Sequence, residues 1–113
     1  AIVGIIAAVA IPAYQKNVQS AKRTDGRAIL TSIMLAQERY FAENMTYTDD
    51  LKDLGYDTSG SVASNDGHYA VSANNCSGST ISECVILKAV GDASTSGDLT
   101  YDSVGNKLPA SEW

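Results

Sequence analysis

The strongest constraint on this chain is its first thirteen residues, AIVGIIAAVAIPA, which contain no polar side chain. The first charge along the chain is Lys16. A helix of about fourteen residues is about 21 Å long, shorter than the ~30 Å hydrocarbon core of a bilayer. The run also lacks a starting Met, a basic segment before it and a cleavage site after it, unlike an intact secretory signal. An internal core strand or helix is the alternative, but because the run begins at residue 1 we expect the remainder of a longer apolar N-terminus.

The residues that follow this run have a helical pattern. Between Tyr14 and Met45 there is no proline, and Gly26 is the only glycine. Four apolar residues recur at spacings of four, three and four, which places them on one face of a helix: Ile29, Ile33, Ala36 and Tyr40. We therefore expect one helix from residue 1 to about residue 45, with this stripe packed against the rest of the domain.

Two residues weaken the N-terminal half of the predicted helix. Pro12 cannot donate a backbone hydrogen bond, so the bond to Ala8 is lost. Gly4 adds a second flexible point. We therefore expect the helix to be softened around these two positions.

The predicted helix is too long for the remaining residues to cover. It would be about 68 Å long, whereas a compact domain of ~100 residues has a radius of gyration of about 13 Å. We expect residues 1–24 to protrude and residues 25–113 to form the globular domain. The protruding apolar side chains must then be buried by lipid or by other copies of the chain: Ile2, Val3, Ile5, Ile6, Val9 and Ile11.

The second half of the chain has a pattern of short elements. Thr48 is the candidate cap of a short helix that Gly55 would end, and residues 57–67 have the composition of a surface loop. Three segments are predicted as strands: 68–73, 84–90 and 99–102. A turn is predicted over 104–107. Short connections favour an antiparallel meander of about three to four strands, so the fold class is α+β, with the long N-terminal helix packed on this small sheet.

Cys76 and Cys84 lie at the inner ends of the first two predicted strands, separated by SGSTISE. Cysteines in this position are well placed to form one disulfide, which is typical of an oxidising compartment. A pair of free thiols is the alternative. The redox spacing C-x-x-C is absent, so the pattern indicates a structural role and not a catalytic one.

Charge is distributed unevenly along the chain. The net charge is -5, but residues 1–39 sum to +3 and residues 40–113 sum to -8. The negative total argues against a basic nucleic-acid-binding module, because sequence-independent affinity for phosphate needs an excess of Lys and Arg. Four basic residues lie just beyond the apolar run: Lys16, Lys22, Arg23 and Arg27. We favour their contact with anionic lipid or with an acidic subunit surface, and contact with DNA is the alternative.

Candidate catalytic and metal-binding groups are few. His68 is the only histidine, and its place at the start of a predicted strand indicates a surface residue more than a catalytic base. No serine lies in a G-x-S-x-G pattern. Two groups of acids offer the oxygen ligands that calcium binds: Asp49, Asp50 and Asp53, and Asp92 with Asp98. Neither matches an EF-hand loop, so we expect solvated turn and cap residues in a non-enzymatic protein without metal or cofactor.

The N-terminal segment AIVGIIAAVAIPAYQKNVQSAK resembles the corresponding part of the type IV pilins. The resemblance is close over residues 1 to about 24, where Gly4 and Pro12 match the helix-softening positions of that family. It extends more loosely through the segment ERYFAENMTYTDDLKDLGY to Trp113, which is similar to the short minor pilins of Gram-negative bacteria. The resemblance implies the pilin fold.

The resemblance also implies a function. Type IV pilins are structural subunits that polymerise through their apolar helices and serve surface adhesion, twitching motility or DNA uptake. They are held in the inner membrane as precursors, cleaved and methylated by a prepilin peptidase, and built by an assembly platform into an extracellular pilus of one or several kinds of pilin. The family's leader and a glutamate near its mature N-terminus have no counterpart in this sequence, so no residue here is given their roles.

Two alternative functions stay open at this point. A pseudopilin of a type II secretion system shares the fold but has other partners, and a membrane-anchored binding module would not polymerise.

The cysteines depart from the family pattern. Many pilins bracket a C-terminal loop with their disulfide, whereas Cys76 and Cys84 join the first two predicted strands. Receptor-binding roles of that C-terminal loop are therefore not carried over.

Overall fold

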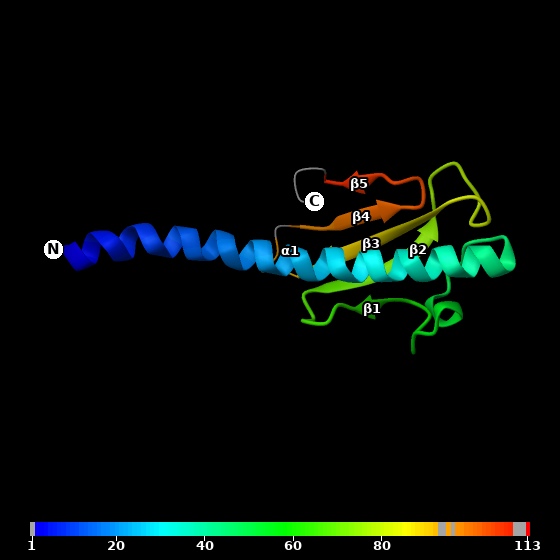
Figure 1. Ribbon diagram of the computed structural model, residues 1–113, viewed down its shortest axis with the longest axis horizontal. Helices are drawn as coiled ribbons and strands as arrows, with labels where there is room; N and C mark the ends of the chain where they lie inside the picture. Colours follow the sequence, from blue (N-terminus) through cyan, green and yellow to red (C-terminus); the bar gives the residue numbers. More distant parts are fainter. Residues whose placement is uncertain (1, 93–94, 96, 110–112) are drawn as a thin grey trace.

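The computed structural model describes residues 2–92, 95, 97–109 and 113, with side chains described from residue 21 onward. The helix α1 (Ile2–Asn44) leads into a short 3-10 helix, η1 (Leu51–Leu54), as Figure 1 shows. Five strands follow: β1 (Val62–Ala63), β2 (Tyr69–Asn75), β3 (Val85–Gly91), β4 (Leu99–Asp102) and β5 (Lys107–Leu108).

The helix α1 sets the longest dimension of the molecule. Its 43 residues correspond to about 64 Å of helix, and the molecule measures 65 × 27 × 20 Å. The half of α1 nearest the N-terminus extends beyond the sheet, and the other half lies across it (Figure 1). The backbone is helical through Gly4 and Pro12, and their softening effect stays a prediction.

The five strands form one antiparallel sheet in the order β1-β2-β3-β4-β5, so each strand pairs with its neighbour in sequence. The expected α+β fold and meander are confirmed, and the three predicted strands correspond to β2, β3 and β4. The sheet is wider than expected, because β1 lies in the predicted loop and β5 overlaps the predicted turn. Both have only two residues, too few for an alternating pattern to appear in the sequence.

One face of the sheet forms the core with α1 and η1. Residues along β2 and β3 alternate between buried and exposed for most of their length, as expected for a sheet with one covered face. The helices contribute Leu30, Ile33, Met34 and Leu51 to the core. The sheet contributes Tyr69, Val71, Ala73, Val85, Leu87, Ala89 and Leu99.

The predicted apolar stripe of α1 lies beside the centre of its buried face. Ile33 is fully buried and Ile29 packs against the core, whereas Ala36 and Tyr40 are half-buried and line a surface groove. The centre of the buried face is formed by Leu30, Ile33, Met34 and Gln37. Gln37 is a polar residue in a core position. Because the sequence pattern considers only apolar residues, the predicted stripe lies about one residue away from the centre of the face that is buried.

The helix approaches the sheet closely at Gly26. A Cβ atom at this position would lie 2.9 Å from ring carbons of Tyr69 and 3.0 Å from Cδ1 of Leu99, and both side chains are buried. We expect Gly26→Ala to lower the free energy of unfolding, because overpacking costs about 1–3 kcal/mol and better helix propensity returns only about 1 kcal/mol. Urea unfolding measures the change, with Thr31→Ala on the exposed face of α1 as the control. A Gly26→Ala protein more stable than the parent would contradict the close approach.

Candidate assembly surface

The projecting half of α1, residues 2–20, is the first candidate site. Its backbone is helical throughout, and the sheet lies beside the other half of the helix (Figure 1). The predicted filament-core and membrane residues lie in this half, where no side chains are described: Ile2, Val3, Ile5, Ile6, Val9 and Ile11. Their role stays a prediction. Within the part of the chain that the structure describes, no helix combines the length and the hydropathy needed to cross a bilayer.

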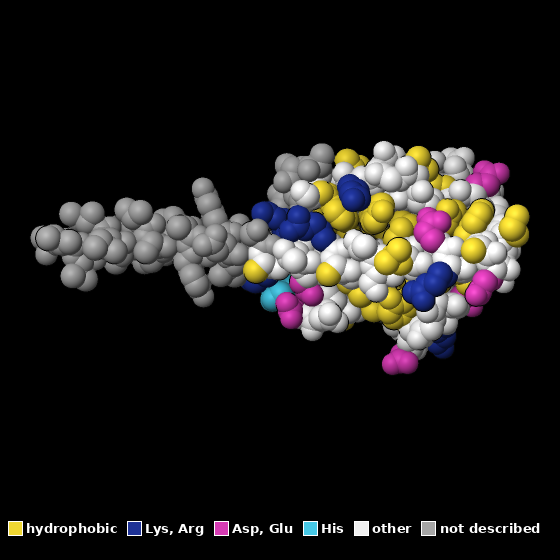
Figure 2. All heavy atoms as spheres, viewed as in Figure 1, with side chains coloured by type: hydrophobic (Ala, Val, Ile, Leu, Met, Phe, Trp, Pro, Cys, Tyr) yellow, Lys and Arg dark blue, Asp and Glu magenta, His cyan; other side chains and the backbone are white. Residues whose placement is uncertain are grey.

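A basic cluster, Lys22, Arg23 and Arg27, stands at the base of the projecting half. All three residues are half-buried, and Nη2 of Arg27 donates a 3.0 Å hydrogen bond to Oγ1 of Thr24. Figure 2 shows Lys and Arg side chains gathered where the globular part meets the projecting helix. The predicted fourth member, Lys16, has a side chain outside the described residues. Cationic side chains therefore mark the boundary between the two halves of α1.

Asp25 lies within this cluster in the sequence, but its carboxylate is buried in the protein. It accepts hydrogen bonds from the Ser64 hydroxyl and, at 3.3 Å, from the backbone N–H of Asp66. The Ser64 hydroxyl oxygen accepts a 3.2 Å hydrogen bond from the backbone N–H of Tyr69. Buried carboxylates are costly unless they are hydrogen-bonded, and these bonds tie α1 to the segment before β2. Asp25, the one acid in the sequence between Lys22 and Arg27, is thus withdrawn from the surface.

The opposite end of the globular domain is acidic. Glu43 is in the last turn of α1, which contains no basic residue. Four further acids follow it closely in the sequence: Asp49, Asp50, Asp53 and Asp57. The surface groove at this end is formed by α1 and the region of η1, and its lining residues are Ala36, Arg39, Tyr40, Glu43, Asp53 and Leu54. We call this feature the acidic groove.

Gln37 fixes the connection between α1 and η1. Its Nε2 donates a 2.7 Å hydrogen bond to the carbonyl oxygen of Thr48, and its Oε1 accepts a 3.1 Å bond from the Thr48 N–H. The predicted cap is wrong: Asp50 caps η1 by accepting a bond from the backbone N–H two residues on. With its backbone held by Gln37, Thr48 donates its hydroxyl to the Asp53 carboxylate at 2.7 Å. Gly55 ends η1 in the left-handed conformation, as predicted.

Tyr47 belongs to the same connection. Its ring stacks on that of Phe41, with centroids 4.7 Å apart. Burial, reinforced by the negative charge of Glu38, raises the pKa of Tyr47 above its ordinary value. The phenol is therefore neutral at physiological pH and adds no charge to this acidic end.

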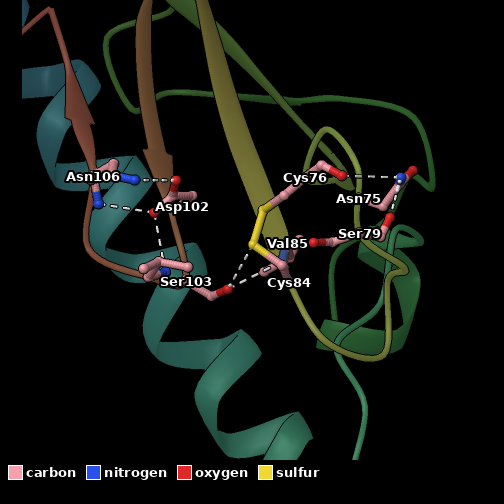
Figure 3. Close-up of a disulfide and its surroundings, with 9 residues drawn as sticks. Asn75, Cys76, Ser79, Cys84, Val85, Asp102, Ser103 and Asn106 are labelled. Carbon is pink, nitrogen blue, oxygen red and sulfur yellow. Dashed lines mark hydrogen bonds between the residues drawn. A yellow bond between two sulfur atoms is a disulfide. The ribbon is translucent and has the colours of Figure 1, made fainter.

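Cys76 and Cys84 form a disulfide with their Cα atoms 5.4 Å apart, which confirms that prediction over free thiols (Figure 3). The bridge closes the loop between β2 and β3. The Ser103 hydroxyl lies beside it, 3.5 Å from Sγ of Cys84, and accepts a 3.2 Å hydrogen bond from the Val85 N–H. Ser103 therefore joins the turn that follows β4 to the β3 end of the disulfide-closed loop.

Removing this disulfide should destabilise the protein. For a loop of this size, the loss of the cross-link should lower the free energy of unfolding by about 2–3 kcal/mol. The test compares urea unfolding of the Cys76→Ser/Cys84→Ser double variant with that of Ser77→Ala, an exposed residue of the same loop. Equal unfolding midpoints for the two variants would show that the bridge does not stabilise the domain.

Three other residues considered above as catalytic or metal-binding candidates have partners within the protein: His68, Asp92 and Asp98. Nδ1 of His68 lies 3.1 Å from Oδ2 of Asp92. The Asp98 carboxylate accepts a 3.0 Å hydrogen bond from the Gly91 N–H and lies 3.8 Å from Nζ of Lys88. Among the residues whose placement is described, no three His, Cys, Asp or Glu side chains are arranged to hold a metal ion. These side chains join the ends of neighbouring strands and turns.

Comparison with known proteins agrees with this architecture. A type IV pilin from Shewanella oneidensis has a similar structure, with a TM-score of 0.60 and 23% identity over 81% of this chain and 92% of that chain. The "Type IV major pilin protein PilA" of Myxococcus xanthus (strain DK1622) is 34% identical over 56 residues, which are 50% of this chain and 26% of PilA. The chain thus matches about a quarter of the length of that relative.

A long N-terminal helix packed on an antiparallel meander, together with these likenesses, defines the class of the type IV pilins. Residues 12–100 match the family described as "Type IV minor pilin ComP, DNA uptake sequence receptor", and the chain belongs to that family. Type IV pilins are structural, non-enzymatic components of extracellular pili, so the predicted pilin fold and the structural class of function are confirmed.

Proposed function

We propose that this chain is a minor subunit of a type IV pilus, held in the filament by the projecting half of α1. The observation that carries the proposal is that residues 2–20 extend beyond the sheet, although thirteen residues at this end have no polar side chain (Figure 1). Removing apolar surface from water lowers the free energy by about 25 cal/mol per Å². Packing among the helices of other subunits supplies that burial, and membership of a minor-pilin family supports it.

Before assembly, we propose that the same segment is held in the inner membrane. A prepilin peptidase would process and methylate the precursor there, and an assembly platform would transfer it to the growing pilus. The basic cluster lies directly after the apolar segment, where it is suited to contact anionic headgroups. These partners are those expected for the family, and each is a separate target for crosslinking in the native host.

The test is the location of the full-length chain in its native host. We expect the chain to be recovered with pili sheared from the cell surface, and deletion of its gene to impair a pilus-dependent property such as adhesion, twitching or DNA uptake. A chain that stays in the membrane fraction while pili are sheared off would contradict the proposal. Loss of exoprotein export with normal piliation would identify a type II secretion pseudopilin instead.

The family description favours DNA binding as a second function of the exposed subunit. A net charge of -5 gives no general attraction for phosphate, so any contact depends on local basic groups. Lys107 on β5 is exposed. Its Nζ is 5.1 Å from the ring centroid of Tyr101 and 5.2 Å from that of Trp113. An exposed cation held beside two aromatic rings is suited to contact a backbone phosphate.

Retention of labelled duplex DNA by purified pili tests this second function. We expect Lys107→Ala to reduce retention and leave the amount of chain in the pili unchanged. Lys52→Ala is the matched control, because Lys52 is an exposed lysine among the acids at the other end. If Lys107→Ala left retention unchanged while removal of the basic cluster lowered it without affecting assembly, the cluster and not Lys107 would be the DNA contact.

A further inference from the structure

The sulfur atoms of this chain belong to two cysteines and two methionines. Cys76 and Cys84 are joined in the disulfide, so neither of them carries a free thiol. Met34 is 4% exposed and lies in the core between α1 and the sheet. Met45 follows the last residue of α1 and is 77% exposed. Of the two thioether groups, the one on Met45 is therefore open to solvent and the one on Met34 is not.

Neither packing nor backbone preference explains a methionine at position 45. The residue lies outside the core, and its φ of 61° is in the left-handed region, which favours glycine. The backbone N–H of Met45 donates a 2.8 Å hydrogen bond to the carbonyl oxygen of Phe41, which holds the residue at the end of α1. A side chain kept in water on a strained backbone indicates a role in solvent, because it contributes nothing to the core.

The chemistry available to an exposed thioether is oxidation by peroxides. The sulfur lone pair attacks one oxygen of hydrogen peroxide, an S–O bond forms and the O–O bond breaks. The second oxygen leaves as water after it takes the hydrogen of the transferred oxygen. The sulfur is oxidised by two electrons to a sulfoxide and the peroxide is reduced, so no further reactant is needed.

We propose that Met45 is an oxidation site of this pilin, where peroxides convert the thioether to a sulfoxide while the fold stays intact. Type IV pilins are components of extracellular pili, so peroxides outside the cell reach the chain without crossing a membrane. The inference goes beyond the proposed pilus function and does not depend on it.

The fold tolerates a sulfoxide at Met45 because this side chain is in water in both the folded and the unfolded chain. The added oxygen turns an apolar surface group into a polar one and removes no core contact. At Met34 the same oxygen would lie in the core formed with Leu30, Ile33 and Leu51, where a polar group without a hydrogen-bond partner is costly. Oxidation should therefore leave stability unchanged at Met45 and lower it at Met34.

Treatment of the purified full-length chain with hydrogen peroxide in detergent micelles tests the proposal. The apolar run ends at residue 13, about 48 Å along the helix from Met45, so detergent bound to this run leaves Met45 in solvent. Trypsin cleaves after Arg39, which places Met34 and Met45 in separate peptides, 28–39 and 40–52. Mass spectrometry then gives the rate at which each methionine gains one oxygen atom.

We expect Met45 in the folded chain to be oxidised on the order of tenfold faster than Met34, because their exposed fractions are 77% and 4%. In urea above the unfolding midpoint the two rates should be equal, which shows that the fold and not the local sequence causes the difference. The unfolding midpoint of the chain oxidised at Met45 should match that of the untreated chain.

Met45→Leu is the matched control, because leucine is an apolar residue of similar size without sulfur. In this variant the peptide 40–52 should gain no oxygen, and the oxidation rate of Met34 should be unchanged. Equal rates for Met34 and Met45 in the folded chain would overturn the proposal. A lower unfolding midpoint after oxidation confined to Met45 would also overturn it, since the sulfoxide would then disturb the fold. Both results concern the single subunit and leave the proposed assembly into pili to its own test.

Discussion

Replacing Ile5 by Arg should abolish incorporation of the chain into pili while its globular domain still folds. A charged residue near the middle of an apolar helix costs about 2.5–3.5 kcal/mol on insertion into a membrane, which corresponds to roughly a hundredfold loss of correctly placed protein. The projecting half of α1 lies outside the sheet, so the core formed around Ile33 and Leu87 does not depend on this position (Figure 1). The measurement is the ratio of variant to wild-type chain in sheared pili, determined by quantitative mass spectrometry.

The control for this substitution is Ser61→Arg, which adds the same charge at an exposed position just before β1. It should assemble normally. Circular dichroism and the unfolding midpoint of both purified full-length variants establish that the domain is intact. If Ile5→Arg entered pili at the wild-type level, burial of the projecting helix would not be what holds the subunit in the filament.

Replacing the buried Ile33 of α1 by Ala should lower the free energy of unfolding far more than replacing the exposed Leu35 of the same helix by Ala. Ile33 is fully buried between α1 and the sheet, and removing its outer carbons leaves a cavity that costs about 2–5 kcal/mol. Leu35 lies two residues away on the same helix and is 58% exposed. Leu35→Ala should therefore change the free energy of unfolding by only about 0.5 kcal/mol.

Urea unfolding of the two variants, monitored by circular dichroism, gives the comparison directly. Both substitutions remove apolar side-chain atoms from the same helix, so the difference between them reports which face of α1 is docked. Similar midpoints for Ile33→Ala and Leu35→Ala would mean that α1 is rotated about its axis relative to the arrangement described above.

Several features of the fold could be predicted because they depend on patterns that extend over many residues. The absence of proline between Tyr14 and Met45 predicts the C-terminal part of α1, and alternation predicts β2 and β3. The disulfide could be predicted because Cys76 and Cys84 flank two segments that pair as a hairpin. The protrusion of α1 follows from length alone, because so few residues cannot cover so long a helix.

Other features depend on single polar contacts between distant segments, which leave no periodic signal. Gln37 occupies a core position because its amide satisfies both backbone groups of Thr48, eleven residues away. Asp25 is an ordinary surface acid by its sequence neighbours, but it bonds to Ser64 across the fold. These two contacts shift the buried stripe of α1 and withdraw Asp25 from the surface, and neither contact could be predicted from the sequence.

The most direct test of the account is electron cryo-microscopy of pili isolated from the native host and enriched for this chain. The account predicts subunits whose globular domains lie on the outside and whose residues 2–20 of α1 pack among the helices of neighbouring subunits. The contradicting result would be pili that lack the chain, together with purified full-length protein that remains as single copies in detergent micelles. It would show that residues 2–20 of α1 are not buried by the helices of other subunits.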